Sequence, residues 1–355
     1  NDAPVLGGMA ASLSYTENAV LLPAGVGTVV DVDNANLGGG VLTVSITSGG
    51  ESNDRLSIRH QGTSAGQVGV SGGVVTFGGV TVGSVTGGGS GTEPLVVTFT
   101  AAATPAIAQA VVRNVTYVNT SDAPVAPLTR TLSWQVTDGV GGTSAAVSQT
   151  VTIVPVNDAP VLGGIGGAVG YTEKTTILPA TQATVFDVDS PDFDTGKLTV
   201  SVATNATTTD RLEIRSEGTG VGQVGVSGGQ ITYGETGLVV GTVTGGTSGS
   251  MPLVVTFNAS ATQAVVQAVV RNVSYRSTSD NPSPLTRVLR YVVGDGDGGT
   301  SATVNQTVTI TPVNDAPVLG GMAASLSYTE NAVLLPAGVG TVVDVDNANL
   351  GGGVL

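Results

Sequence analysis

Short runs of apolar residues alternate with polar residues along the chain and are separated by glycine-rich turns. Up to residue 154 this pattern predicts strands at 12–15, 19–22, 28–30, 41–47, 54–59, 94–100, 115–118, 130–137 and 145–154. From Gln67 to Thr86, Val/Thr runs are interrupted by Ser-Gly-Gly and Gly-Gly, which predicts a meander of hairpins. Many short strands with almost no helix predict an all-β protein built from antiparallel β-sandwiches.

One segment, residues 104–113, has helical spacing instead. Thr104 can cap a helix, Pro105 suits the first helical position, and apolar residues follow at intervals of three and four. The sequence therefore predicts one short helix here. Because a repeat of about 150 residues is generous for a seven-strand sandwich, we interpret residues 67–113 as an insertion into it.

The whole pattern repeats. The six residues Val-Asn-Asp-Ala-Pro-Val occur at 156–161 and again at 313–318, and the chain opens inside a third copy. Residues 314–355 are identical to residues 1–42. We predict three domains, namely a first repeat at 1–156, a second repeat at 157–313 and the N-terminal part of a third at 314–355. Because both ends lie inside repeats, we expect a segment of a longer protein.

The junction between repeats combines stiffness with oxygen ligands. Proline fixes its own φ and favours an extended residue before it, so the junction is a stiff spacer. Asn and Asp supply side-chain oxygens, and Ca²⁺ collects six to eight oxygens in proteins. A simple turn is the alternative, since the same residues form turns. The return of the motif at domain-sized spacing favours a calcium-binding junction.

Composition excludes several classes of partner and chemistry. The net charge of −14 argues against nucleic acid and anionic membrane surfaces, and favours cations. The chain has no cysteine, and its single histidine, His60, is replaced by Ser216 in the second repeat. A shared thiolate, zinc or histidine-based catalytic site is therefore excluded. Asp187 and Asp189 could be a glycosidase pair, but no aromatic cleft accompanies them, and Trp134 is expected in the core. We predict that the protein is not an enzyme.

A family resemblance becomes specific at the end of each repeat. Residues 137–144, Thr-Asp-Gly-Val-Gly-Gly-Thr-Ser, precede alternating Val and Thr and then the 156–161 junction. This arrangement is similar to the end of a cadherin repeat and its linker, and more closely resembles the cadherin-like tandem repeats of large bacterial surface adhesins. The resemblance covers both complete repeats, whereas the 67–113 region departs from a compact cadherin repeat.

The resemblance implies calcium at each junction, held by a glutamate and an acidic loop of one repeat and by the linker and an Asp-x-Asp pair of the next. At the first junction the matching residues are Glu17, Asp122, Asn157, Asp158, Asp187 and Asp189. At the second they are Glu173, Asp280, Asn314, Asp315, Asp344 and Asp346. At the start of the chain they are Asn1, Asp2, Asp31 and Asp33.

Sandwich geometry adds the Asp-Gly turn between the last two strands, because that turn lies at the end where the chain enters. It would bring Asp138 to the Asn1 group, and Asp295 and Asp297 to Asn157. A hairpin turn without metal is the alternative. The five carboxylates predicted at the first junction would repel one another without a cation between them.

The functional expectation is a structural segment of a long extracellular repeat protein, a rod stiffened by Ca²⁺ that serves as an adhesin stalk or cell-surface filament. Its expected partners are calcium and neighbouring repeats of the same chain, and self-association through exposed strand edges is left open. We expect no nucleic acid and no membrane insertion in this segment. The alternative is a carbohydrate- or protein-binding adhesion module with its binding face in 67–113 and 223–271.

Overall fold

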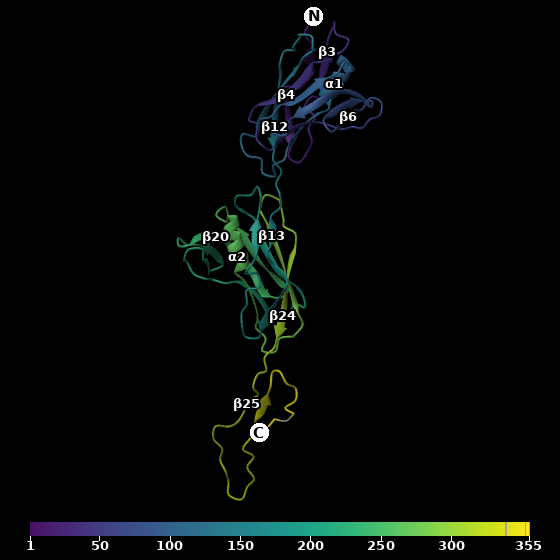
Figure 1. Cartoon of the computed structure of the whole chain (residues 1–355). Helices are drawn as coiled ribbons and strands as arrows, with labels where there is room; N and C mark the ends of the chain where they lie inside the picture. Colours follow the sequence, from purple (N-terminus) through teal and green to yellow (C-terminus); the bar gives the residue numbers. More distant parts are fainter. Residues whose placement is uncertain (338, 352, 355) are drawn as a thin grey trace. The chain divides into compact units, whose positions relative to one another are not determined.

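The computed structural model describes residues 1–337, 339–351, 353 and 354. They form two compact units, Asn1–Val156 and Asn157–Leu355 (Figure 1). The second unit contains both the predicted second repeat and the predicted start of a third, so the division at residue 313 stays a prediction from the sequence.

The first unit is built on an eight-stranded sheet. Its strands, in spatial order, are β2 (Ser12–Thr16), β12 (Val147–Val154), β11 (Thr129–Val136), β4 (Val41–Ser48), β9 (Leu95–Phe99), β8 (Val80–Gly87), β7 (Val74–Phe77) and β6 (Val68–Ser71). Neighbours are antiparallel except β2 and β12, which pair in parallel from Ser12–Thr150 to Thr16–Val154. The hairpins predicted between residues 67 and 86 are present. The region 67–113, interpreted as an insertion, is continuous with the large sheet, because β9 pairs directly with β4.

Two short pairs and a helix cover this sheet. They are β1 (Val5–Gly7) with β3 (Thr28–Val30), β5 (Asp54–Ile58) with β10 (Val115–Asn119), and α1 (Pro105–Arg113), which packs beside β3. The predicted helix is confirmed, and its cap is Thr104, whose Oγ1 accepts the Ile107 N–H at 3.3 Å. The strand predicted at 19–22 is wrong in extent, because only Leu21 forms a bridge, to Tyr117.

One apolar core fills the space between these layers. Leu42 and Trp134 come from the large sheet, Leu56 comes from β5, and Val111 and Val112 come from α1. All five are buried, as alternation along the strands and helical spacing in α1 predict. Trp134 thus lies in the core, as expected from the sequence.

The second unit repeats this topology. Its large sheet has the order β14 (Ala168–Thr172), β24 (Val304–Thr311), β23 (Arg287–Gly294), β16 (Lys197–Thr204), β21 (Met251–Phe257), β20 (Leu238–Ser248), β19 (Gln230–Tyr233) and β18 (Val224–Ser227). The other elements are β13 (Val161–Gly163), β15 (Thr184–Phe186), β17 (Asp210–Ile214), β22 (Val273–Ser277), α2 (Gln263–Arg271), β25 (Val318–Gly320) and β26 (Thr341–Val343). Both units are therefore all-β sandwiches with an added hairpin region and one short helix. Among the described residues, no helix is long and apolar enough to span a bilayer.

One edge of each large sheet, formed by β6 in the first unit and β18 in the second, has backbone amides that are bonded to side chains of the same unit. In the first unit His60 Nδ1 accepts the Val70 N–H at 2.9 Å, and Gln61 Oε1 accepts the Val68 N–H at 3.0 Å. In the second unit Ser216 and Glu217 accept the corresponding N–H groups of β18 at 3.1 and 3.2 Å. These amides are unavailable to another strand, so the structure does not favour association through this edge.

A buried polar network joins the two layers. Arg130 Nε lies 2.8 Å from Asp54 Oδ2, and both side chains are fully buried. The Tyr117 hydroxyl donates to Asp54 Oδ1 at 2.6 Å, and burial followed by the Asp54 carboxylate raises the pKa of Tyr117. Tyr15 stacks edge-on against Tyr117 with ring centres 5.1 Å apart. The second unit repeats the network with Asp210, Arg287, Tyr275 and Tyr171.

The same sequence folds differently where its partner strand is missing. Residues 12–16 form β2 beside β12, and Tyr15 is 1% exposed. The identical residues 325–329 form no strand, and Tyr328 is 63% exposed. No counterpart of β12 exists among the described residues after 314. Local pattern alone therefore does not make this strand, which depends on its parallel neighbour.

Candidate metal centre

Three acidic residues of the second unit converge where the repeat ends. Glu173 follows β14, Asp280 lies in the loop after β22, and Asp315 lies in the junction after β24. One carboxylate oxygen from each lies within 4.8 Å of the others. They meet because β14 and β24 are parallel neighbours that end at the same edge, with Thr172 opposite Thr311. Glu173 is buried, Asp315 is half-buried and Asp280 is exposed.

The glutamate also fixes the start of the junction. Glu173 Oε2 accepts the Val313 N–H at 2.9 Å. The first unit repeats this contact, with Glu17 Oε2 accepting the Val156 N–H at 2.9 Å. One oxygen of each glutamate is thus bonded to the linker backbone.

The remaining ligands predicted for the second junction lie beside this group. Asp346 accepts a hydrogen bond from the Asp315 N–H, and Asp344 Oδ1 accepts the Asp346 N–H at 3.0 Å. Asn347 Nδ2 donates to Asn314 Oδ1 at 2.9 Å. Asn347 also donates its backbone N–H to Asp344 Oδ1, so it connects Asp344 to Asn314. Contacts of this kind link the six predicted residues into one group, which comprises Glu173, Asp280, Asn314, Asp315, Asp344 and Asp346.

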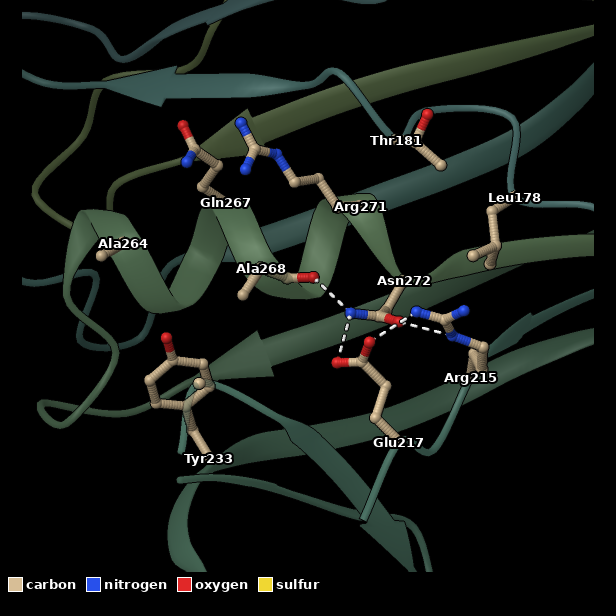
Figure 2. Close-up of a pocket in the computed structure, with 11 residues that line it drawn as sticks. Leu178, Thr181, Arg215, Glu217, Tyr233, Ala264, Gln267, Ala268, Arg271 and Asn272 are labelled. Carbon is tan, nitrogen blue, oxygen red and sulfur yellow. Dashed lines mark hydrogen bonds and ion pairs between the residues drawn. The ribbon is translucent and has the colours of Figure 1, made fainter. Parts of the chain in front are cut away.

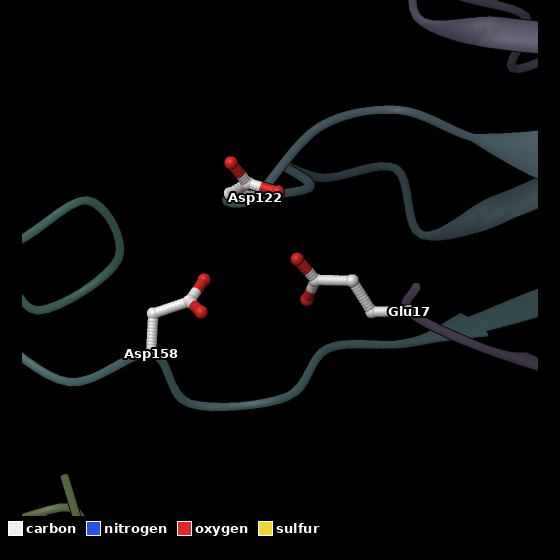
Figure 3. A group of neighbouring side chains, drawn as sticks. All are labelled: Glu17, Asp122 and Asp158. Atoms are coloured by element: carbon white, nitrogen blue, oxygen red, sulfur yellow. The ribbon is translucent and has the colours of Figure 1, made fainter. Parts of the chain in front are cut away.

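The first unit holds the matching residues at its own C-terminal end. Figure 3 shows the carboxylates of Glu17 and Asp122 turned toward each other, and one oxygen from each lies within 4.8 Å of the other. Asp158, drawn with them, belongs to the start of the second unit.

The start of the second unit gathers the other residues predicted for the first junction. Asp158 N–H donates to Asp189 Oδ2 at 3.2 Å, and Asn157 Nδ2 donates to Asp295 Oδ2 at 2.9 Å. Asp187 Oδ1 accepts the Asp189 N–H at 3.3 Å. Asp295 therefore joins Asn157, as the sandwich geometry predicts. The Asp297 side chain is exposed and its backbone N–H bonds Asp295 Oδ1, which fits the hairpin-turn alternative for that residue.

Two buried oxygens in this group lack hydrogen-bond donors. Asp187 Oδ2 and Asp189 Oδ1 are enclosed and have no hydrogen-bond partner among the described residues. Asp187 is only 2% exposed, and its burial raises the pKa of the carboxyl. Buried acceptors without donors are costly unless an ion or water satisfies them. A cation beside these two oxygens would remove that cost.

The start of the first unit has the same arrangement. Asn1 Nδ2 donates to Asp138 Oδ2 at 2.7 Å, and this hydrogen bond lowers the pKa of Asp138. The Asp2 N–H donates to Asp33 Oδ2 at 2.8 Å and lowers the pKa of Asp33. Asp31 Oδ1 accepts the Asp33 N–H at 3.3 Å. The predicted position of Asp138 beside Asn1 is therefore observed.

Sequence reasoning missed one residue of the site, Lys174. Its Nζ donates a hydrogen bond to Asp315 Oδ1, which raises the pKa of the lysine, and it lies 3.5 Å from Glu173 Oε1. Asn18 takes the same place after Glu17 in the first repeat, and both residues have φ of 62°. A comparison of the two repeats could have found it, because Asn18 follows Glu17 in the first repeat and Lys174 follows Glu173 in the second.

The donor set fits a hard cation. Every candidate ligand offers a carboxylate, amide or backbone oxygen, and neither histidine nor cysteine takes part. Oxygen-only sites suit Ca²⁺ or Mg²⁺ rather than zinc or copper. The many ligands and their mixture of buried and exposed carboxylates suit the larger coordination number of Ca²⁺.

Comparison with known proteins gives similarity at the level of structure. No family model and no curated protein matches the chain. It is similar to mouse cadherin-23 EC22-24, over 98% of this chain and 80% of that one, with 12% identity and a TM-score of 0.33. It is also similar to the collagen adhesin of S. aureus, over 88% and 92%, with 9% identity and a TM-score of 0.21. A third is the C-terminal domain of the antigen I/II-family protein AspA of Streptococcus pyogenes, over 87% and 99%, with 10% identity and a TM-score of 0.25.

Proposed function

We propose that this chain is a structural segment of an extracellular adhesin stalk in which Ca²⁺ stiffens the junctions between β-sandwich repeats. The observation that carries the proposal is the pair of buried oxygens without donors, Asp187 Oδ2 and Asp189 Oδ1, beside the Asn157-Asp158 linker. The grouping of Glu173, Asp280 and Asp315 within 4.8 Å supports the same role at the next linker.

In the proposed arrangement each ion binds residues from both sides of a linker. At the first junction Glu17 and Asp122 supply oxygens from one repeat, and Asp158, Asp187 and Asp189 supply them from the next. When bound, the ion supplies positive charge that neutralises these carboxylates and connects the two sandwiches. The proline of the linker restricts the backbone between them. Stiffness, rather than catalysis, is the expected result.

The stabilisation from each ion is expected to be modest. Extracellular calcium modules bind with Kd of roughly 10⁻⁴ to 10⁻³ M, so millimolar calcium would add about 0.4 to 1.4 kcal/mol per ion. A change of this size raises the melting temperature of a domain of 150–250 residues by roughly 1 to 6 °C. Calcium should change the dimensions of the chain by a larger fraction than it changes the stability, because the bound ion would restrict motion at the linker between repeats.

The test compares the chain in 1–2 mM calcium with the same chain in chelator, by small-angle scattering and thermal melting. We expect a longer, narrower distance distribution and a higher melting temperature with calcium. Asp187→Asn combined with Asp189→Asn should reduce both responses, whereas Asp194→Asn, at an exposed position nearby, should leave them intact. Identical dimensions and melting with and without calcium would refute the proposal.

Self-association into a multi-chain filament is the less favoured form of this function. Side chains of His60 and Gln61, and of Ser216 and Glu217, already occupy amides on the outer edge of each large sheet. A filament of several chains would need another surface. The single-chain stalk requires none.

A further inference from the structure

A depression of about 420 Å³ lies over the outward face of α2 (Figure 2). Its floor is formed by Ala264 and Ala268, whose small side chains leave room above the helix. Tyr233 from β19 stands on one side, and Leu178 and Thr181 stand on the other. The volume lies within the roughly 300–1,000 Å³ typical of small-ligand sites.

One end of the depression is a closed polar network. Arg215 Nε donates to Asn272 Oδ1 at 2.9 Å, and Asn272 Nδ2 donates to Glu217 Oε2 at 3.1 Å. Arg215 also pairs with Glu217 Oε1, so the two charges at this end cancel (Figure 2). The carboxylate of Glu217 is therefore committed to the protein and is a poor acceptor for a ligand.

The helix face supplies donors that are held in place but left without partners. Arg271 Nε donates to Ala183 O at 2.8 Å, and its terminal nitrogens have no hydrogen-bond or ion-pair partner among the described residues. Gln267 Oε1 accepts the Val185 N–H at 3.3 Å, which leaves its amide NH₂ without a partner in the part of the chain that the structure describes. These residues are one helical turn apart and project from the same face. Anchoring one end of each side chain reduces the entropy lost when the other end binds.

We propose that this depression binds an acidic saccharide unit, a sugar that carries a carboxylate or sulfate group. The Arg271 guanidinium is the one cation in the depression without a charged partner among the described residues, so it would receive the acidic group. Gln267, Thr181 and the Tyr233 hydroxyl supply hydrogen-bonding groups for sugar hydroxyls. The alanine floor and the Tyr233 ring supply flat apolar surface for the sugar ring. Such a site would add ligand recognition to the structural role proposed above.

The first repeat shows which parts of this arrangement are shared. Arg113 Nε bonds Gly27 O at 2.7 Å and Gln109 Oε1 accepts the Val29 N–H at 3.3 Å, so the anchored pair occurs in both helices. The position of Tyr233 is taken by Phe77 and that of Glu217 by Gln61. The first repeat therefore lacks both the tyrosine hydroxyl and the glutamate that pairs with Arg215. The variant Tyr233→Phe introduces the residue of the first repeat and tests the contribution of the hydroxyl.

The experiment titrates the full chain, in chelator, with trigalacturonate, a sulfated galactose oligosaccharide and a neutral galactose trisaccharide, by NMR chemical-shift changes. We expect at least one acidic sugar to bind saturably and more tightly than the neutral one. Arg271→Gln should weaken that binding by about tenfold or more, since it removes a charge-assisted contact. Tyr233→Phe should weaken it by a smaller factor. Arg290→Gln, an exposed arginine outside the depression, should have no effect.

A second variant guards against loss of folding, because Arg271→Gln also removes the bond to Ala183 O. Gln267→Glu keeps an oxygen for the Val185 N–H and adds repulsion toward an acidic ligand, so it should weaken binding while the melting temperature is retained. No saturable binding of either acidic sugar, equal binding of the neutral sugar, or unchanged binding by folded Arg271→Gln and Gln267→Glu would overturn the proposal. Because calcium is absent, these outcomes leave the junction proposal untouched.

Discussion

The ammonium group of Lys174 donates a hydrogen bond to Asp315 across the end of the second repeat, and the same group lies 3.5 Å from Glu173. Lys174 therefore places a fixed positive charge among the carboxylates that would bind calcium. The first repeat has the neutral Asn18 at this position. The two junctions should consequently differ in their affinity for calcium, the second being weaker, because like charges repel.

The first prediction exchanges these two residues. Lys174→Asn should increase calcium affinity at the second junction several-fold, and Asn18→Lys should decrease it at the first. Both positions have φ of 62°, so each backbone already accommodates the other residue. Isothermal titration calorimetry with calcium measures the affinity of the wild type and of each variant. Equal titration curves for wild type and both variants would show that Lys174 does not compete with the ion.

The second prediction concerns the buried pair of Arg287 and Asp210. Arg287→Met leaves Asp210 as an uncompensated buried charge and should lower the free energy of unfolding of the second unit by about 3–5 kcal/mol. Arg290→Met, an exposed position on the same strand, should change it by less than about 0.5 kcal/mol. Urea unfolding followed by circular dichroism measures both. Similar losses for the two variants would argue against an energetic role for the pair.

The third prediction is a decline in stability at alkaline pH. Burial, followed by the neighbouring Asp210, raises the pKa of Tyr275 above that of an unfolded tyrosine. The unfolded chain then releases this proton at lower pH than the folded chain, so the free energy of unfolding should fall as pH rises above about 10. Tyr275→Phe should make this decline shallower, whereas the exposed Tyr328→Phe should not. Urea unfolding between pH 8 and 11.5 tests the difference in slope.

The fourth prediction uses two glycines of the hairpin region. Gly246 has φ of +72°, and a Cβ there would lie 2.0 Å from Leu212 O. Gly246→Ala combines backbone strain with a clash against backbone and should destabilise the second unit by more than about 3 kcal/mol. Gly228 has φ of +56° and open space, so Gly228→Ala should cost only about 1–2 kcal/mol. Thermal unfolding compares them, and equal losses would show that the close approach to Leu212 has no consequence.

Much of the fold was predictable because repetition and alternation were strong. The strands at 41–48 and 95–99 were predicted within one or two residues, and the helix from 105 to 113 within one. The strand β1 was missed because three residues after the proline are too few for an alternating pattern. Residues 19–22 look apolar enough for a strand, but the left-handed Asn18 and Pro23 confine them to a single bridge at Leu21.

The site was predictable to the extent that its ligands share one chemistry. Acidic and amide side chains at recurring positions pointed to Asp187, Asp189 and their counterparts without knowledge of strand pairing. Lys174 was missed because a positively charged residue does not fit a search for oxygen ligands. The depression over α2 lies partly within 223–271, the alternative binding face predicted from the sequence, but Arg271 was not singled out, because the residues that line the depression are far apart in sequence. Such contacts depend on tertiary structure.

The parallel pairing of β2 with β12 has a consequence for a chain under load. The two strands point in the same direction, but β2 lies near the start of the repeat sequence and β12 lies near its end. Pulling on the two ends of the repeat therefore draws β2 and β12 in opposite directions along their length. The hydrogen bonds between Ser12–Thr16 and Thr150–Val154 then resist shear together instead of opening one at a time. We expect single-molecule pulling to give one high rupture force per complete repeat, and Leu13→Pro, which removes a donor from this pair, to lower that force.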